Sequence, residues 1–412
     1  MSTAASDIAI PTGLLKQITA APHRLMFFIG AANVLCAMTW WMLWLVGARW
    51  QLVSMHTPEV PAGWMHAMVM QYQVLPSFMF GFLLTVFPRW MNQPALTKWH
   101  YVPVGAGLFG GQIATMCSLI AGAPLLKAGA VLTFTGWLIG TALLLRLVYR
   151  DGAKTWHAVS CTFALSFGLL GLALYGIFLT HFDGRLIFTA IKLGSIAVLL
   201  PIYFTVCHRM IPFFASAALP GYSAPRPLWS LGAMWGAALL HVWLELRHGY
   251  ALLWVADLPL LGISAYLLSL WWPRRRTMPP LLSVLMLGFA WLPIAFALYS
   301  LQSLWYAIDG NFVLGRAPAH ALFIGFFGSL LVAMVTRVTQ GHSGRPLVLG
   351  NVAGFAFVLV QVCAVLRIVA EIVPDSLAWQ SVAAILWIVA FLPWVVRSLW
   401  IYSTPRADGR AG

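Results

Sequence analysis

Long apolar runs recur along almost the whole chain, and short polar connections separate them. An α-helix rises about 1.5 Å per residue, so about 20 apolar residues are enough to cross the hydrocarbon core of a bilayer. No connection is long or polar enough to form a separate soluble domain. The pattern therefore predicts an all-α, polytopic integral membrane protein, with residues 1–412 forming a single transmembrane helical domain. The twelve predicted spans are 25–46, 66–87, 101–121, 126–149, 156–180, 186–207, 227–247, 250–272, 279–302, 318–339, 347–372 and 376–402.

Lysine and arginine are distributed unequally between the two sides of these spans. The N-terminus and every second connection carry seventeen of them, and the remaining connections carry six. Basic loops are retained in the cytoplasm, so we expect both termini there, with residues 1–24 as a cytoplasmic segment and 403–412 as a cytoplasmic tail. The alternation also favours an even number of spans, because one missed helix would disrupt it.

Composition supports this class and excludes several others. Only 8% of the residues are charged, whereas a soluble domain has about 25%. The net charge of +14 lies in short loops, which favours orientation in a lipid membrane over a nucleic-acid partner. The chain has no P-loop, no G-x-S-x-G, no H-E-x-x-H and no C-x-x-C-H, which excludes the usual covalent attachment of haem c. Few of the ten acidic residues lie at membrane depth, which counts against an ion-driven carrier.

Two histidines open predicted spans on the same side of the membrane, opposite the termini. His66 begins the second span and His320 begins the tenth. His66 and Met70 are four residues apart, so imidazole and thioether share one helix face. Imidazole suits haem iron or copper, and thioether with imidazole suits copper(I). The alternatives are a hydrogen-bonded interfacial histidine and a methionine that only packs.

A second group of histidines lies on the side of the termini. His23 precedes the first span, His208 is followed by Arg209 after the sixth, and His342 follows the tenth. About 30 Å of helix separates His320 from His342, so one helix presents an imidazole to each membrane surface. Histidine beside arginine suits a haem edge, with guanidinium groups for the propionates. The alternative is anchoring by positive charge, which requires arginine but not histidine.

A third pattern lies at the end of the seventh span. His241, Glu245 and His248 follow helical spacing and could form a metal site or a proton relay, since a carboxylate within a membrane usually has a partner. The alternative is a salt bridge from Glu245 to Arg247 or Arg185. Lys192 lies within the sixth span without an acidic neighbour in sequence.

The stretch HALFIGFFGSLLVAMVTRVTQGHSGRPL, from His320 to Leu347, carries a family resemblance. It resembles the signature of the NnrS family, in which H-A-L is followed by M-T-R and then by G-H-[ST]-G-R-P-L. The segment from His66 to GFLLTVFPRW and the segment RMIPFF at 209–214 also resemble family motifs, and the resemblance covers all twelve spans. Many members open the second span with W-H-A-H-E-M. Here His66 is retained, but Met68 and Val69 replace the second histidine and the glutamate.

The resemblance implies a haem-containing and copper-containing protein of the bacterial inner membrane that acts in nitric oxide metabolism or resistance to nitrosative stress. We therefore expect haem b, with copper as a second cofactor, and nitric oxide as ligand or substrate of an oxidoreductase supplied by an electron donor that the sequence does not identify. The expected ligands are His66 and His320 at one site and His342 with His23 or His208 at the other. Arg209, Arg337 and Arg345 are the candidates for propionates, and Met70 is a further candidate metal ligand. The alternative function is a membrane transporter or a haem-handling or metal-handling protein without turnover, and the oligomeric state, a homo-oligomer included, stays open.

Overall fold

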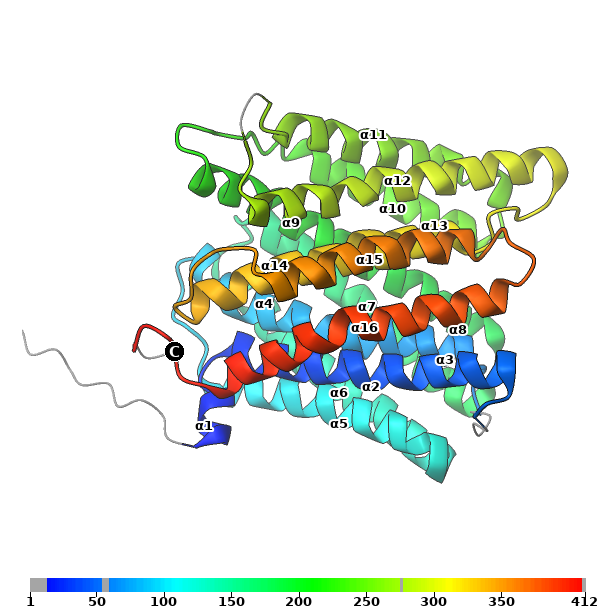
Figure 1. Ribbon diagram of the computed structural model, residues 1–412, viewed down its shortest axis with the longest axis horizontal. Coiled ribbons are helices and arrows are strands. Elements are labelled where there is room, and N and C mark those ends of the chain that lie inside the picture. Colours follow the sequence, from blue (N-terminus) through cyan, green and yellow to red (C-terminus); the bar gives the residue numbers. More distant parts are fainter. Residues whose placement is uncertain (1–12, 54–58, 275–276, 410–412) are drawn as a thin grey trace, which may run out of the picture.

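The computed structural model describes residues 13–53, 59–274 and 277–409, and in these ranges the protein is built from helices, without a strand. Long helices lie side by side in one bundle (Figure 1). The first half of the predicted N-terminal segment, Arg275, Arg276 and the last residues of the tail lie outside the described ranges. The elements are α1 (Leu14–Ile18), α2 (Pro22–Trp50), α3–η1–α4 (Ala62–Val69, Met70–Val74 and Leu75–Trp90), α5 (Lys98–Ala121), α6 (Ala123–Arg150), α7 (Trp156–His181), α8–η2–α9 (Gly184–Lys192, Leu193–Leu199 and Leu200–Ala218), α10 (Trp229–Leu246), η3 (Tyr250–Leu252), α11 (Trp254–Trp271), α12 (Pro280–Asp309), α13–η4–α14 (Ala317–His320, Ala321–Gly328 and Ser329–His342), α15 (Asn351–Val369) and α16 (Ser376–Ser403).

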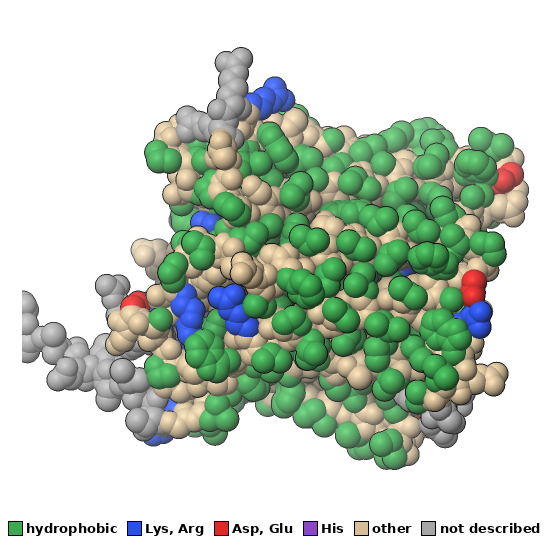
Figure 2. Space-filling model, in the orientation of Figure 1, with side chains coloured by type: hydrophobic (Ala, Val, Ile, Leu, Met, Phe, Trp, Pro, Cys, Tyr) green, Lys and Arg blue, Asp and Glu red, His purple; other side chains and the backbone are tan. Residues whose placement is uncertain are grey.

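Each predicted span corresponds to one of these helices, so the prediction of a polytopic helical membrane protein is confirmed. Eleven helices in the described ranges are long and apolar enough to cross a membrane. The span predicted at 227–247 is α10, an 18-residue helix that is not among the eleven. Hydrophobic side chains cover most of the face shown in Figure 2, and the lysine and arginine side chains visible there lie toward its ends. Such a surface suits lipid.

The first and last described helices meet at one end of the bundle (Figure 1). α1 contacts α16, and the Arg24 guanidinium of α2 donates to the Thr404 carbonyl after α16. At the other end, Arg49 of α2 pairs with Asp375, the N-cap of α16, at 2.6 Å. This hydrogen-bonded guanidinium holds the pKa of Asp375 below its usual value. The start of α2 and the end of α16 therefore lie at the same end of the bundle, while the even number of crossings and the cytoplasmic side of the termini stay predictions.

Three helices are interrupted by π-helical turns: α3–η1–α4, α8–η2–α9 and α13–η4–α14. They are the second, sixth and tenth predicted spans, so every fourth span is an interrupted helix. They are also the most enclosed of the eleven: 89%, 67% and 83% of their most apolar windows are buried, against 39–56% elsewhere. These three helices therefore form the centre of the bundle, and π-turns of this kind are frequent at functional sites.

Prolines account for two of the three interruptions. Pro76 follows η1 and Pro201 follows η2, each at the second residue of the next α-helix. A proline ring lacks an N–H and clashes with the carbonyl four residues earlier, so the helix before it must widen. For Pro76 that carbonyl belongs to Tyr72, and it accepts instead from the Trp137 indole at 2.8 Å. The third turn, η4, has no proline.

Close helix contacts hold these turns in place. A Cβ on Gly194 of η2 would lie 2.2 Å from the Gln71 side chain of η1, and a Cβ on Gly325 of η4 would lie 2.5 Å from the Trp291 ring of α12. Glycine permits such contact because it has no side chain. Within η4 the contact is close at Gly325 only, since a Cβ on Gly328 of the same turn would have its nearest neighbour at an ordinary 3.4 Å.

Candidate cofactor site

A cavity of about 340 Å³ lies among the three interrupted helices. Its lining includes residues of α3, α8 and α13, which lie at the end of the bundle away from α1 (Figure 1). Residues of all three π-turns line it, together with residues of α2, α10, α12, α15 and α16. We call it the main cavity. Its volume falls within the range of about 300–1,000 Å³ that is usual for small-molecule and cofactor pockets. His66 and His320 both line it, so the two histidines that open the second and tenth spans face the same space.

His66 is held by stacking. The Trp41 indole lies on its imidazole with 4.3 Å between ring centroids and 10° between planes. Its Nδ1 atom is buried and has no hydrogen-bond partner in the structure. Met70 lines the same cavity, at the first position of η1, so the predicted sharing of a face by His66 and Met70 is confirmed.

His320 is held by a hydrogen bond to the turn before it. Its Nδ1 lies 2.9 Å from the carbonyl oxygen of Arg316. A carbonyl can only accept, so the proton is on Nδ1 and the Nε2 lone pair is left free for a metal. This is the arrangement by which proteins usually orient a histidine ligand.

Two arginines accompany the histidines in the main cavity. Arg316 precedes His320 by four residues, and Arg367 comes from α15 and pairs with Glu371. Arg367 is buried, whereas Arg316 is exposed. Guanidinium groups bind carboxylates with charge-assisted hydrogen bonds, so this cavity offers anchors for an anionic edge. Sequence reasoning missed both, although the four-residue spacing between Arg316 and His320 was a usable signal.

The residues of the main cavity fit a haem group. The cavity provides two imidazoles, one with a fixed tautomer and one with an unpartnered buried nitrogen, and two arginines for propionates. Aromatic and aliphatic side chains supply most of the remaining lining, as a porphyrin face requires, and its other polar members are Gln71, Lys192, Ser195, Glu245 and Gln380. His66 with Met70 also matches the donors that copper(I) prefers.

The predicted histidine site near the termini is smaller. His23 and His342 lie together, with ring centroids 4.3 Å apart, so one of the two expected pairings is present. The cavity beside them, which includes Arg24, measures only about 10 Å³. That is room for about one water molecule. In this conformation the pair fits a single ion and not a porphyrin.

The other expected pairing, of His342 with His208, is not what the structure contains. His208 instead lies 2.9 Å from His157, between Nδ1 and Nε2, and its own Nε2 lies 3.2 Å from the Pro227 carbonyl. The three arginines expected at propionates pack on aromatic rings that do not line the main cavity: Arg209 on Trp90, Arg337 on Phe214 and Arg345 on Trp400. Cation–π contact accounts for their positions.

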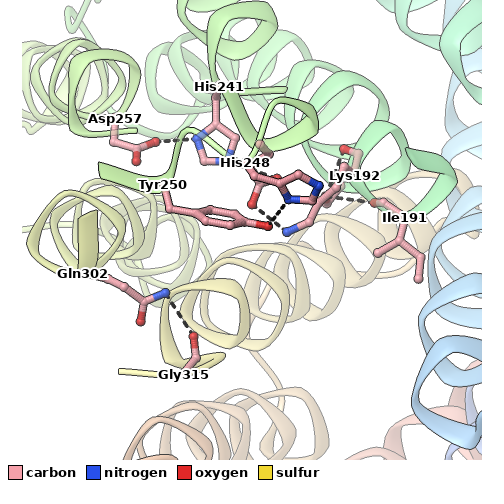
Figure 3. A network of polar contacts seen from close by, with 10 residues as sticks. Ile191, Lys192, His241, His248, Tyr250, Asp257, Gln302 and Gly315 are labelled. Carbon is pink, nitrogen blue, oxygen red and sulfur yellow. Dashed lines mark hydrogen bonds and ion pairs between the residues drawn. The ribbon is translucent and has the colours of Figure 1, made fainter. Parts of the chain in front are cut away.

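The third pattern also differs from its prediction. Glu245 pairs with Lys192 at 2.6 Å, and not with Arg247 or Arg185. His241 lies 3.5 Å from Glu245 and 2.6 Å from Asp257, which sequence reasoning overlooked. His248 follows α10 with a positive φ and bonds Tyr250 at 2.8 Å, so it leaves the line of His241 and Glu245 (Figure 3).

Within the described ranges, no three His, Cys, Asp or Glu side chains gather as a metal cluster. A metal in the main cavity would therefore rely on two histidines with a thioether or a macrocycle. All five cysteines are free; three are buried among apolar groups, and Cys36 and Cys117 are exposed.

Comparison with protein families finds that the model described as NnrS protein matches residues 17–406. No curated protein matches the chain.

Proposed function

Because the chain belongs to the NnrS family, we propose that it is a haem-binding redox protein of the bacterial inner membrane that binds nitric oxide in the main cavity. Family membership links the chain to the response to nitric oxide. The proposal includes haem b at His66 and His320, copper as a second cofactor, an electron donor and turnover of nitric oxide.

The observation that carries the proposal is that His66 and His320 face one cavity from two interrupted central helices. They are 254 positions apart in the chain by their numbering, yet each precedes a π-turn. His320 stands directly before η4, and His66 stands four residues, about one helical turn, before η1. An imidazole buried in an apolar bundle normally bonds a neighbour, and His66 Nδ1 has none. A metal-bound group between the helices would give both rings a role.

The chain's own residues would perform distinct tasks at this centre. Trp41 and the Arg316 carbonyl hold the two imidazoles in fixed orientations. Arg316 and Arg367 would bind the propionates, and the aromatic lining would exclude water from the rest of the cavity. Bound there, haem would supply a redox-active iron with affinity for nitric oxide.

Copper has two places to bind in this proposal. Met70 with His66 offers soft donors in the main cavity. His23 and His342 offer two imidazoles around a space suited to one ion. A copper ion fits the small cavity beside His23 and His342 better than haem does.

The test is a reduced-minus-oxidised optical spectrum of the purified full-length protein, with iron and copper analysis on the same sample. We expect b-type haem bands that change when nitric oxide is added. His342→Ala should lower copper and leave these bands unchanged. A colourless, metal-free protein would contradict the proposal and favour the transporter alternative.

A further inference from the structure

Four ionisable side chains form a continuous row beside the main cavity, three of them buried and the fourth, Lys192, partly exposed at 27%. Asp257 of α11 contacts His241 of α10 at 2.6 Å, His241 lies 3.5 Å from Glu245, and Glu245 contacts Lys192 of α8 at 2.6 Å. Figure 3 shows Asp257, His241 and Lys192 following one another across three helices. Asp257 and His241 have no accessible side-chain surface, and Glu245 has 6%. We call these four residues the proton cluster.

The proton cluster ends at two cavities. Lys192 and Glu245 line the main cavity, and both also line a second one of about 220 Å³, the side cavity. Tyr299, Arg316 and Ala319 belong to both linings as well, so the two cavities adjoin. The side cavity extends to Phe312 and Gly315, in the connection between α12 and α13. A connection between spans lies at a membrane surface, so the side cavity leads from that surface toward the main one.

The cluster has unused capacity for protons. One oxygen of Asp257 is buried without a hydrogen-bond partner. Nε2 of His241 and one oxygen of Glu245 have only each other, at 3.5 Å, which is an ion-pair distance and too long for a good hydrogen bond. Buried charges cost free energy unless they are fully paired, and a well-packed apolar set would usually be at least as stable. Two carboxylates held within a membrane protein in a partly satisfied network therefore indicate a task other than stability.

We propose that the proton cluster takes up one proton from the membrane surface, through the side cavity, when the centre at His66 and His320 gains one electron. This inference rests on the proposed redox function of the main cavity. An electron added inside a medium of low dielectric favours a compensating positive charge nearby. The electron comes from a one-electron donor, the proton forms an N–H or O–H bond within the cluster, and no other bond changes.

Ionisable side chains on all the helices packed around the proton cluster influence this proton uptake. Protons in such a row belong to the whole set and not to one residue, because the members interact strongly. The entry to the side cavity carries a further pair, since the exposed His248 bonds Tyr250, which lines that cavity. The ionisable groups that line the two cavities or contact the cluster are Lys192 from α8, His241 and Glu245 from α10, Tyr250 from η3, Asp257 from α11, Tyr299 from α12, Arg316 and His320 at α13, and His66, Cys363 and Arg367 across the main cavity.

The experiment is a redox titration of the haem bands in the purified protein at several values between about pH 6 and pH 8. One proton per electron lowers the midpoint by about 59 mV for each tenfold fall in proton concentration. We expect a slope approaching this in the unmodified protein and a clearly smaller slope in Glu245→Gln and Asp257→Asn. Asp309→Asn is the matched control, because Asp309 is an exposed carboxylate that lines neither cavity.

The outcomes separate this inference from the proposed function. A haem-containing protein whose midpoint is independent of pH overturns proton uptake and leaves the haem proposal intact. An unchanged slope in both variants places the proton elsewhere and also overturns the inference. A colourless protein contradicts both proposals. If Glu245→Gln loses haem because Glu245 lines the main cavity, Asp257→Asn decides alone, since Asp257 lines neither cavity.

Discussion

The Trp41 indole lies flat on the His66 imidazole, with 4.3 Å between ring centroids and 10° between planes. Trp41 in turn stacks on Trp44, at 5.3 Å and 3°. The Nδ1 atom of His66 has no hydrogen-bond partner, so stacking replaces the bond that usually orients a histidine ligand. The two histidines of the main cavity are thus oriented in different ways, His66 by a ring and His320 by a carbonyl.

Trp41→Leu should therefore weaken the hold of His66 on a metal. Loss of an orienting partner typically costs about 10- to 100-fold in affinity. We expect haem to dissociate faster from this variant by a factor in that range, measured by its transfer to a haem-free acceptor protein. Trp44→Leu is the control, because Trp44 contacts Trp41 and does not line the main cavity. Equal effects of both changes would show that the aromatic stack matters only for packing.

The pairing of His66 with His320 gives a second prediction. An axial pair loses its hold on iron when either member is removed, so His66→Ala and His320→Ala should abolish the same b-type bands. The spectrum of each variant, normalised to protein, is the measurement. His181→Ala should keep the bands, since His181 ends α7 and lines no described cavity. If the two alanine variants lose different bands, the histidines hold separate centres.

The sequence predicted this pairing because hydropathy fixes where each span begins. His66 and His320 both open spans on the same side of the membrane, so the sequence predicts that they lie at the same depth. Long apolar runs also located a helix at each of the twelve predicted spans, although the predicted boundaries differ by several residues, as with Ala62–Trp90 against 66–87. Depth is therefore readable from a single sequence.

Lateral position is not readable in the same way. Which helix lies beside which depends on packing between distant segments, so the partners of Lys192 and His208 could not be assigned. Asp257 was overlooked for this reason, and the argument that acidic groups are scarce at membrane depth missed that two of them converge on His241. The π-turns at η1 and η2 did have a signal, because Pro76 and Pro201 lie within apolar runs.

A third prediction concerns the arginines. Arg316→Gln removes a guanidinium from the main cavity and keeps the backbone carbonyl that holds His320. A hydrogen bond to a charged group contributes about 1.5–3 kcal/mol, so haem affinity should fall by about 10- to 100-fold. Haem titration of the apoprotein is the measurement. Arg185→Gln is the control, because the Arg185 side chain is 93% exposed.

The same titration separates two assignments of the propionate contacts. Sequence reasoning placed Arg337 at a propionate, whereas the structure places its guanidinium 4.1 Å from the centre of the Phe214 ring. Arg337→Gln should therefore leave haem affinity unchanged. A loss in Arg337→Gln with none in Arg316→Gln would support the sequence-based assignment and argue against propionates at Arg316.

Gly325 provides a fourth prediction, on stability. A Cβ at this position would lie 2.5 Å from the rigid Trp291 ring, whose indole donates to Gln361 at 2.6 Å. Gly325→Ala must displace α12 or the ring, and overpacking of this kind costs about 1–3 kcal/mol. We expect a lower midpoint of thermal unfolding in detergent, followed by tryptophan fluorescence. Gly236→Ala on α10 should not lower the midpoint, because nothing lies within 4 Å of its Cβ and alanine favours helix. If Gly325→Ala unfolds at the same temperature as the unmodified protein, η4 does not pack on α12 as closely as the structure has it.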